Sequence, residues 1–121
     1  MPNAAFDPVR QLIDFHAAIN RLDYEWIEQA FAEDAAYISA GTGSKVGRDA
    51  ILVAFRAYFE TYPDQIAWND RVEQVDSHVA RSYWNLKATH AQTGQPLERT
   101  GVETIEFDHE GRIIKVLVED R

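Results

Sequence analysis

The residues best placed to do chemistry are Arg99 and Glu103, which belong to a segment of alternating residue types near the C-terminus. Alternate residues of a β-strand share one face, so both side chains point to the same side, roughly 13 Å apart along an ideal strand. A carboxylate enclosed by apolar groups is disfavoured in its charged form, which suits a general acid, or a base near neutral pH. A guanidinium can orient a substrate or stabilise negative charge. We therefore predict that Glu103 transfers protons and that Arg99 assists it.

A structural role is the alternative for both residues. A buried arginine and glutamate can form an ion pair that organises a core without taking part in a reaction. Arg99 can pair with Glu103 or with Asp120, and it can equally bind the carboxylate or phosphate of a ligand through its planar fork. The sequence leaves open which of these partners it meets.

Two histidines are further candidates. His16 lies on the apolar stripe of a predicted helix, where it could act as a base or proton shuttle. A core histidine with satisfied ring nitrogens is the alternative, because no triad or metal pattern accompanies it. His90 is predicted to face inward at the mouth of a pocket. The histidines are not at metal-ligand spacing and cysteine is absent, so we expect neither a metal nor another cofactor.

Length and charge limit the class of protein. The 121 residues suit a single domain covering 1–121, which can bury a core without disulfides. A formal net charge of -8 with scattered basic residues argues against nucleic acid and acidic membranes as partners. No stretch approaches the ~20 apolar residues needed to cross a bilayer. The N-terminal residues do not form a secretory signal, and we expect a cytoplasmic protein.

Helices are predicted in the first half of the chain. Asp7-Pro8 and Asp23 are start signals, because aspartate caps a helix and proline fits its first position. The second helix is predicted to include Phe31 on its apolar face. The remaining predicted elements here are a strand over 35–39, a loop over 41–44 near the pocket rim, and a helix over 48–62.

From Gln65 onward the apolar residues recur with a period of two. This pattern predicts four strands, over 65–76, 79–91, 97–107 and 112–120. Short turns between successive strands indicate an antiparallel meander. Helices followed by a meander are typical of an α+β fold. We expect three N-terminal helices packed in the concave face of a curved antiparallel sheet, with one pocket between them.

Alternation also predicts which side chains face the pocket. The odd residues of 97–107 are assigned inward because this set is apolar at both ends, and Gly101 then leaves space between Arg99 and Glu103. The second strand of the meander is predicted to point Trp84, Leu86, Ala88 and His90 inward. The last strand is predicted to point Ile114, Val116, Val118 and Asp120 inward. In the first strand of the meander, over 65–76, Trp68 and Asp70 are assigned inward and a bulge is expected further along the strand.

Three segments resemble the SnoaL-like branch of the nuclear transport factor 2-like superfamily: Asp23 to Ile38, Gly47 to Ile51, and Phe107 to Ile113. They follow one another with the spacing of that family, over nearly the whole chain. The resemblance implies an α+β cone and a dimer formed through the outer sheet face. It leaves the reaction open, because this fold hosts cyclases, isomerases, hydrolases, dehydratases and non-catalytic binding domains.

Ketosteroid isomerase is the nearest mechanistic template within that superfamily. It uses a carboxylate base together with a tyrosine and a protonated acid. The resemblance puts the tyrosine on Phe15, the base on Ser39 beside Tyr37, and the acid on Glu103. Since only Glu103 keeps the required chemistry, we do not expect this isomerase activity.

The sequence therefore predicts a small-molecule-binding SnoaL-like protein. Its abundant aromatic residues are core by default, but some can form a wall that selects a flat or apolar ligand. Acid–base chemistry of the cyclase, isomerase or dehydratase type is the main hypothesis, and a non-catalytic dimeric ligand-binding or accessory domain is the alternative. The expected ligand contacts are Phe15, Ser39, Tyr58, Trp68, Trp84, His90 and Asp120. Apolar residues assigned to the outer sheet face (Tyr83, Val102, Ile113 and Leu117) predict a homodimer.

Overall fold

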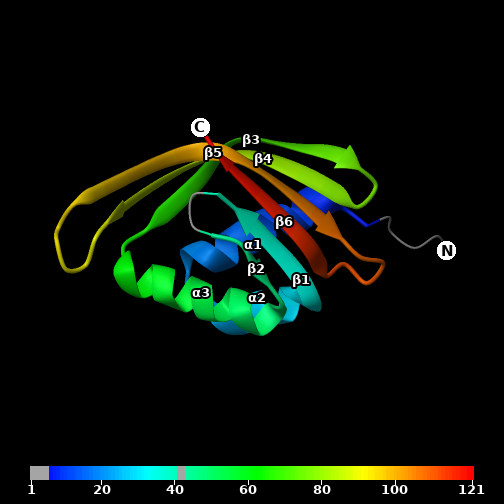
Figure 1. The fold of residues 1–121 in the computed structure, drawn as a ribbon. Coiled ribbons are helices and arrows are strands. Elements are labelled where there is room, and N and C mark those ends of the chain that lie inside the picture. The colour runs from blue at the N-terminus through cyan, green and yellow to red at the C-terminus, as the bar shows by residue number, and fades with distance from the viewer. Residues whose placement is uncertain (1–5, 41–42) are drawn as a thin grey trace.

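A computed structural model describes residues 6–40 and 43–121, and it folds as a sheet curved over three helices (Figure 1). The elements are α1 (Pro8–Asn20), α2 (Tyr24–Ala30), β1 (Phe31–Ser39), β2 (Lys45–Val46), α3 (Arg48–Thr61), β3 (Ile66–Asp76), β4 (Val79–Thr89), β5 (Pro96–Phe107) and β6 (Ile113–Asp120). In the described part of the chain, no helix has the length and apolar character needed to cross a membrane. The predicted α+β class is confirmed.

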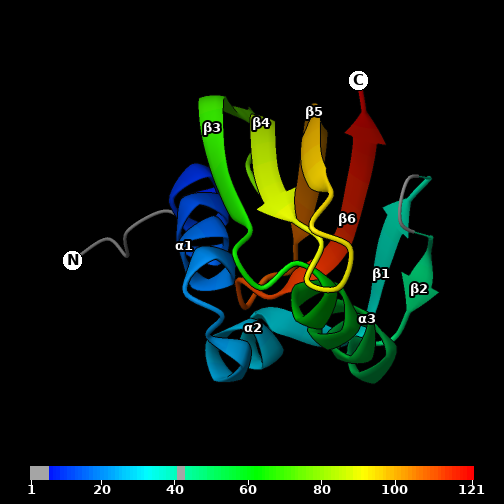
Figure 2. The ribbon, with the colours of Figure 1, turned by 90° about the vertical axis from the view of Figure 1, so that its left-hand side faces the viewer.

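The strands form one six-stranded sheet with the order β2-β1-β6-β5-β4-β3. The meander β3 to β6 is antiparallel, as its short turns predict. The sheet is nevertheless mixed, because β1 runs parallel to β6. No hairpin joins these two strands, so no tight turn forces them to be antiparallel. Seen from the side, α2 and α3 lie below the sheet while α1 lies along β3 (Figure 2).

The helix starts are where the sequence predicts them. The side chain of Asp7 accepts hydrogen bonds from the backbone N–H groups of Val9 and Arg10, both at 3.1 Å. Asp23 does the same for Trp26 at 3.1 Å. The second helix, however, ends at Ala30, and Phe31 is the first residue of β1 rather than part of a helical face. Phe31 is fully buried, and an apolar residue alone does not distinguish a buried strand start from a buried helix end.

The predicted faces of β4 and β5 are confirmed. Trp84 pairs with Gly101 across these two strands, and Arg99 and Glu103 line the concave side. A Cβ added to Gly101 would lie 2.7 Å from the Trp84 ring and would also collide with the carbonyl oxygen of Glu119. The space that glycine leaves is therefore filled by the indole of Trp84.

The predicted faces of β3 are wrong at two residues. Trp68 is 43% exposed and pairs with Asn85, a residue of the outer face. Asp70 accepts a hydrogen bond from the same Asn85 at 2.9 Å, so it too lies outside. Their neighbour Asn69 takes the inward position opposite Trp84. A polar residue inside and an apolar one outside reverse the usual pattern, and the strand register also shifts just after Asn69.

The assignment in β6 is wrong at its first two residues. Ile113 is fully buried in the core, whereas Ile114 is exposed. Phe107 pairs with Ile113 and the preceding Glu106 pairs with Lys115, so Ile114 is an extra, bulged residue. One inserted residue moves the residues before it to the opposite face. Beyond the bulge, Val116 and Val118 are buried as predicted.

Candidate active site

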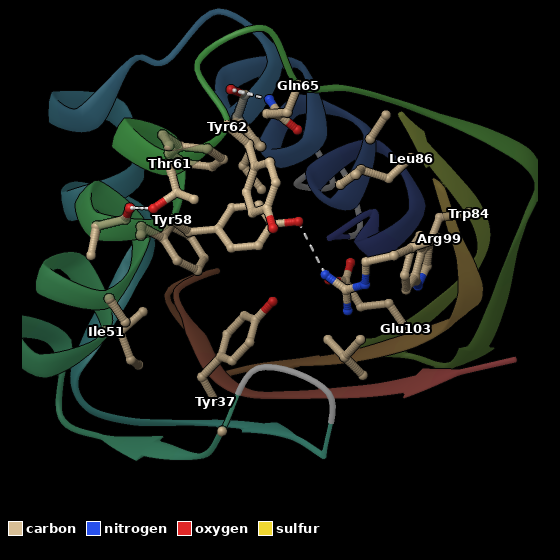
Figure 3. Close-up of a pocket in the computed structure, with 18 of the residues that line it drawn as sticks. Tyr37, Ile51, Tyr58, Thr61, Tyr62, Gln65, Trp84, Leu86, Arg99 and Glu103 are labelled. Atoms are coloured by element: carbon tan, nitrogen blue, oxygen red, sulfur yellow. Dashed lines mark hydrogen bonds between the residues drawn. The ribbon is translucent and has the colours of Figure 1, made fainter. Parts of the chain in front are cut away.

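A cavity of about 450 Å³ lies between the helices and the concave face of the sheet (Figure 3). This volume is within the range of pockets that hold drug-sized organic ligands. Most of its wall is apolar or aromatic, and this part includes Ile51, Phe55, Phe59, Trp84, Leu86 and Val118. Gly43 of the predicted 41–44 loop and the neighbouring Lys45 also line it. Residues 41 and 42 lie outside the described residues.

Two of the predicted residues meet directly at the cavity wall. His16 of α1 and Glu103 of β5 lie 2.5 Å apart, between Nε2 and Oε1. The other ring nitrogen, Nδ1, lies 3.2 Å from Oδ1 of Asn69 on β3. Both partner atoms are acceptors, so an imidazolium that donates from each nitrogen satisfies all three groups. Asn69 is a residue that the prediction missed, because it was assigned to the outer face.

The surroundings of His16 favour its charged form. Burial lowers the pKa of His16, but the negative charge of Glu103 and the hydrogen bonds to Glu103 and Asn69 raise it by more, so the net pKa is above its ordinary value of 6.5. The His16 side chain is only 13% exposed and that of Glu103 8%. A histidinium in this position places a positive charge beside the carboxyl group of Glu103 in a mostly apolar cavity.

Glu103 uses only one of its carboxylate oxygens in this contact. Among the described residues, Oε2 makes no hydrogen bond, and Glu103 lines the cavity. A carboxylate oxygen without a protein partner can accept a proton or a hydrogen bond from a bound molecule. The arrangement can therefore perform general acid–base chemistry.

Arg99 pairs with Asp120 instead of Glu103. Its Nε donates to Oδ2 of Asp120 at 2.9 Å and its Nη2 to Oδ1 at 2.8 Å, a bidentate contact. Its Nη1 donates to the hydroxyl oxygen of Tyr58 at 3.2 Å. Burial lowers the pKa of Arg99, but the contacts to Asp120 and Tyr58 outweigh it, and the guanidinium stays charged. Three of the five N–H groups of Arg99 are thus held by protein partners, and its charge is paired with Asp120.

Two tyrosine hydroxyls face the same cavity. Tyr37 projects into it from β1, and its hydroxyl makes no hydrogen bond within the described chain (Figure 3). Burial, and then the charge of Glu103, raise the pKa of Tyr37. Burial also raises the pKa of Tyr58, although Arg99 opposes this. Both phenols therefore remain protonated donors over the physiological pH range.

Tyr37 was missed as a site residue, although a signal was present. Ala35 and Ser39 are the buried residues of this part of β1, and Tyr37 shares their alternation. The same reasoning that predicted the faces of β5 would have pointed Tyr37 inward.

The other predicted ligand contacts divide into two groups. Tyr58 and Trp84 line the cavity. Phe15 and Ser39 are buried but lie outside its wall, and Phe15 packs beside the ring of His16 in the core. Asp120 reaches the cavity only through Arg99, and together with Trp68 it lines a separate hollow of about 330 Å³.

The contacts of His90 stabilise a turn rather than the cavity wall. It follows the end of β4, and its Nδ1 accepts hydrogen bonds from the N–H groups of Gln92 at 3.2 Å and Thr93 at 3.3 Å. Its ring packs against Tyr62. It does not line the large cavity, because its ring nitrogen is turned to the 90–95 turn.

The fold is shared with solved structures of low sequence identity. Bal32a, from a soil-derived mobile gene cassette, is 23% identical with a TM-score of 0.86, covering 98% of this chain and 92% of its own. SalBIII, an epoxide hydrolase/cyclase-like enzyme in pyran ring formation in the polyether salinomycin, is 16% identical with a TM-score of 0.81. The match covers 93% of this chain and 88% of SalBIII. RV0760c from Mycobacterium tuberculosis, solved in complex with estradiol-17beta-hemisuccinate, is 13% identical with a TM-score of 0.81. The match covers 92% of this chain and 91% of RV0760c.

Sequence comparison gives the family. No curated protein matches this chain. The family model described as "SnoaL-like domain" matches residues 10–116, which include every element from α1 to the middle of β6. Since this match spans most of the chain and the fold agrees with it, the protein belongs to the SnoaL-like domain family.

Proposed function

We propose that this protein binds an aromatic or otherwise apolar organic molecule in its cavity and acts on it by acid–base chemistry. The observation that carries the proposal is the His16–Glu103 contact at the wall of an apolar cavity, with Oε2 of Glu103 open to a ligand. Cyclisation, isomerisation and dehydration are the reaction types that such a base serves. Each begins with removal of a proton next to a group that can take up the electron pair.

The proposed roles follow from the geometry. Glu103 removes a proton from a carbon beside a carbonyl group, and the C–H electron pair moves to the carbonyl oxygen to give an enolate. Tyr37 donates a hydrogen bond to that oxygen as its charge develops. His16 stays protonated and balances the charge of Glu103. Glu103 then returns its proton to the product, and Arg99 acts as a positioning residue through its hydrogen bond to Tyr58.

Two of the similar structures support this ligand class. SalBIII is an enzyme of ring formation, and RV0760c was solved with a steroid ester. The steroid ester bound by RV0760c is the kind of molecule that suits a large apolar cavity with a few polar groups. At such low identity these proteins share the fold alone, so the proposal depends on the residues of this chain.

A non-catalytic ligand-binding domain is the second candidate. It is favoured by the contacts of Arg99, because its charge is already paired with Asp120 and a further N–H group donates to Tyr58. In that case the cavity holds its ligand without transforming it, and Glu103 serves as a hydrogen-bond acceptor only.

Proton exchange in a simple ketone separates the two candidates. 2-Tetralone is an apolar bicyclic ketone whose α-protons exchange with D₂O, and NMR follows this exchange. We expect the wild type to accelerate it over buffer, and the Glu103→Gln variant to lose the acceleration while still binding the ketone. Circular dichroism checks that the variant is folded. Wild-type protein that binds 2-tetralone without accelerating exchange would support the binding domain.

We further propose that the protein is a homodimer formed through the outer face of the sheet. Trp68 and Ile66 are exposed large apolar residues of β3 on that face, and exposed apolar groups at a sheet surface favour association. Ile113 no longer supports this proposal, because it lies in the core. Light scattering at micromolar concentration should give twice the 13.8 kDa chain mass, and a monomer mass would contradict the dimer.

A further inference from the structure

The side chain of Gln65 has an acceptor that the protein leaves unused. Gln65 lies between α3 and β3 and lines the cavity on the side opposite Tyr37 (Figure 3). The residue is only 6% exposed. Its Nε2 donates to the carbonyl oxygen of Ile19 at 3.4 Å. Its Oε1 is fully buried and has no hydrogen-bond partner among the described residues.

An unpaired buried acceptor costs free energy that a partner would recover. The contact to Ile19 fixes the orientation of the amide, because a turned amide would bring Oε1 against that carbonyl oxygen. The cavity therefore presents an acceptor at this end and donors at the other. Ile19 and Ala67, which line the cavity beside it, offer side chains with no donor.

We infer that the ligand is polar at both ends: a hydroxyl or N–H group meets Oε1 of Gln65, and an acceptor oxygen meets the hydroxyl of Tyr37. Between these ends the ligand is apolar, as the aromatic wall requires. Hydroxylated cyclic or aromatic ketones are the chemical class that fits. This inference rests on the proposed function, since it describes the molecule bound in the same cavity.

Three naphthalene ketones test the inference. 6-Hydroxy-2-acetylnaphthalene carries both groups, 6-methoxy-2-acetylnaphthalene has lost the donor, and 2-acetylnaphthalene is the unsubstituted size control. Their affinities for the wild type and for Gln65→Leu are measured by fluorescence titration. Leucine removes the acceptor at similar volume. Circular dichroism and thermal unfolding check that the variant is folded.

We expect the wild type to bind the hydroxy compound about tenfold more tightly than the other two, a typical effect of satisfying one buried acceptor. In Gln65→Leu this preference should fall to about one. If the Leu variant does not fold, the wild-type preference among the three probes decides.

The failures of the two proposals are distinguishable. Wild-type protein that binds all three ketones equally would overturn the inference about Gln65 and leave the proposed function intact, as when a buried water occupies the acceptor. A preference that persists unchanged in Gln65→Leu would assign the donor site to another residue. Absence of binding by any of the ketones would contradict both proposals.

Discussion

The concave face of the sheet carries two pairs of opposite charges, and they differ in what they leave unused. Arg99 and Asp120 make a two-point contact, and a third N–H group of the guanidinium, on Nη1, donates to Tyr58. His16 and Glu103 meet through one oxygen only, Oε2 makes no hydrogen bond among the described residues, and Glu103 lines the cavity. We call Arg99–Asp120 the closed pair and His16–Glu103 the open pair. The closed pair stabilises the structure, whereas the open pair has an oxygen that can exchange a proton. On the proposed function, Arg99 is therefore the structural charge and Glu103 the reactive one on the same strand.

The largest expected effect distinguishes the two acids. Glu103→Gln should lower the rate of 2-tetralone exchange by about 10²–10⁴-fold, because a positioned general base contributes a factor of this size. Asp120→Asn keeps that base and should lower the rate by less than about tenfold. Exchange is followed by NMR in D₂O. Equal losses in the two variants would remove the distinction between the pairs.

Removing the cation of the closed pair should mainly affect stability. Arg99→Met keeps the aliphatic stem but leaves Asp120 and the Tyr58 hydroxyl without their donor, which should cost about 1–3 kcal/mol of unfolding free energy. Urea denaturation measures this change at a constant m-value. Lys87→Met, which removes an exposed ion-pair partner of Glu98, is the matched control and should change stability little. A loss of exchange activity without a loss of stability would mean that Arg99 acts on the ligand directly.

Tyr37, whose hydroxyl faces the cavity, should affect ligand binding rather than stability. Tyr37→Phe removes a hydroxyl that has no hydrogen bond within the described chain, so the affinity for 2-acetylnaphthalene should fall about three- to tenfold, the usual contribution of one hydrogen bond. Tyr24→Phe, at a tyrosine outside the cavity wall, should leave the affinity unchanged. Fluorescence titration compares them. Unchanged binding in Tyr37→Phe would place the ketone oxygen elsewhere.

The smallest expected effect is a pH dependence specific to the open pair. The pKa of His16 is raised in the folded protein above its ordinary 6.5. Its contribution to stability is thus fully present below 6.5 and is lost as pH rises through the raised value. The difference in unfolding free energy between wild type and His16→Gln should therefore shrink on going from pH 6 to alkaline pH. In the same titration, the difference for Arg99→Met should change less between pH 6 and pH 9, because the raised pKa of Arg99 keeps the guanidinium charged over this range.

The sequence predicted the charged face of β5 and offered Asp120 as one possible partner of Arg99, but it did not predict the partner of Glu103. Arg99 and Glu103 were placed correctly because the odd-numbered residues of 97–107, to which both belong, are apolar at both ends of the strand. Their partners come from elsewhere in the chain: His16 lies 87 positions before Glu103. Such contacts depend on how α1 packs on the sheet, which residue alternation does not specify.

The errors in β3 and β6 have a single physical origin. A bulge inserts one residue into a strand, and it reverses the faces of the residues on one side of it. Ile114 is such a residue in β6, and the register of β3 shifts after Asn69. Since apolar residues stand on both sides of each irregularity, no local pattern shows where it falls. Trp68 was thus assigned inward, and Asn69, which contacts His16, was overlooked.

The indole that covers Gly101 has a consequence for the base. Trp84 occupies the position between Arg99 and Glu103, and the guanidinium carbon lies 5.2 Å from the centre of its ring. Without that aromatic spacer, the flexible arginine could extend along the strand and neutralise the carboxylate. An uncharged aromatic side chain thus lies between the Arg99 guanidinium and the Glu103 carboxyl group, and each of these groups meets a different partner, Asp120 and His16.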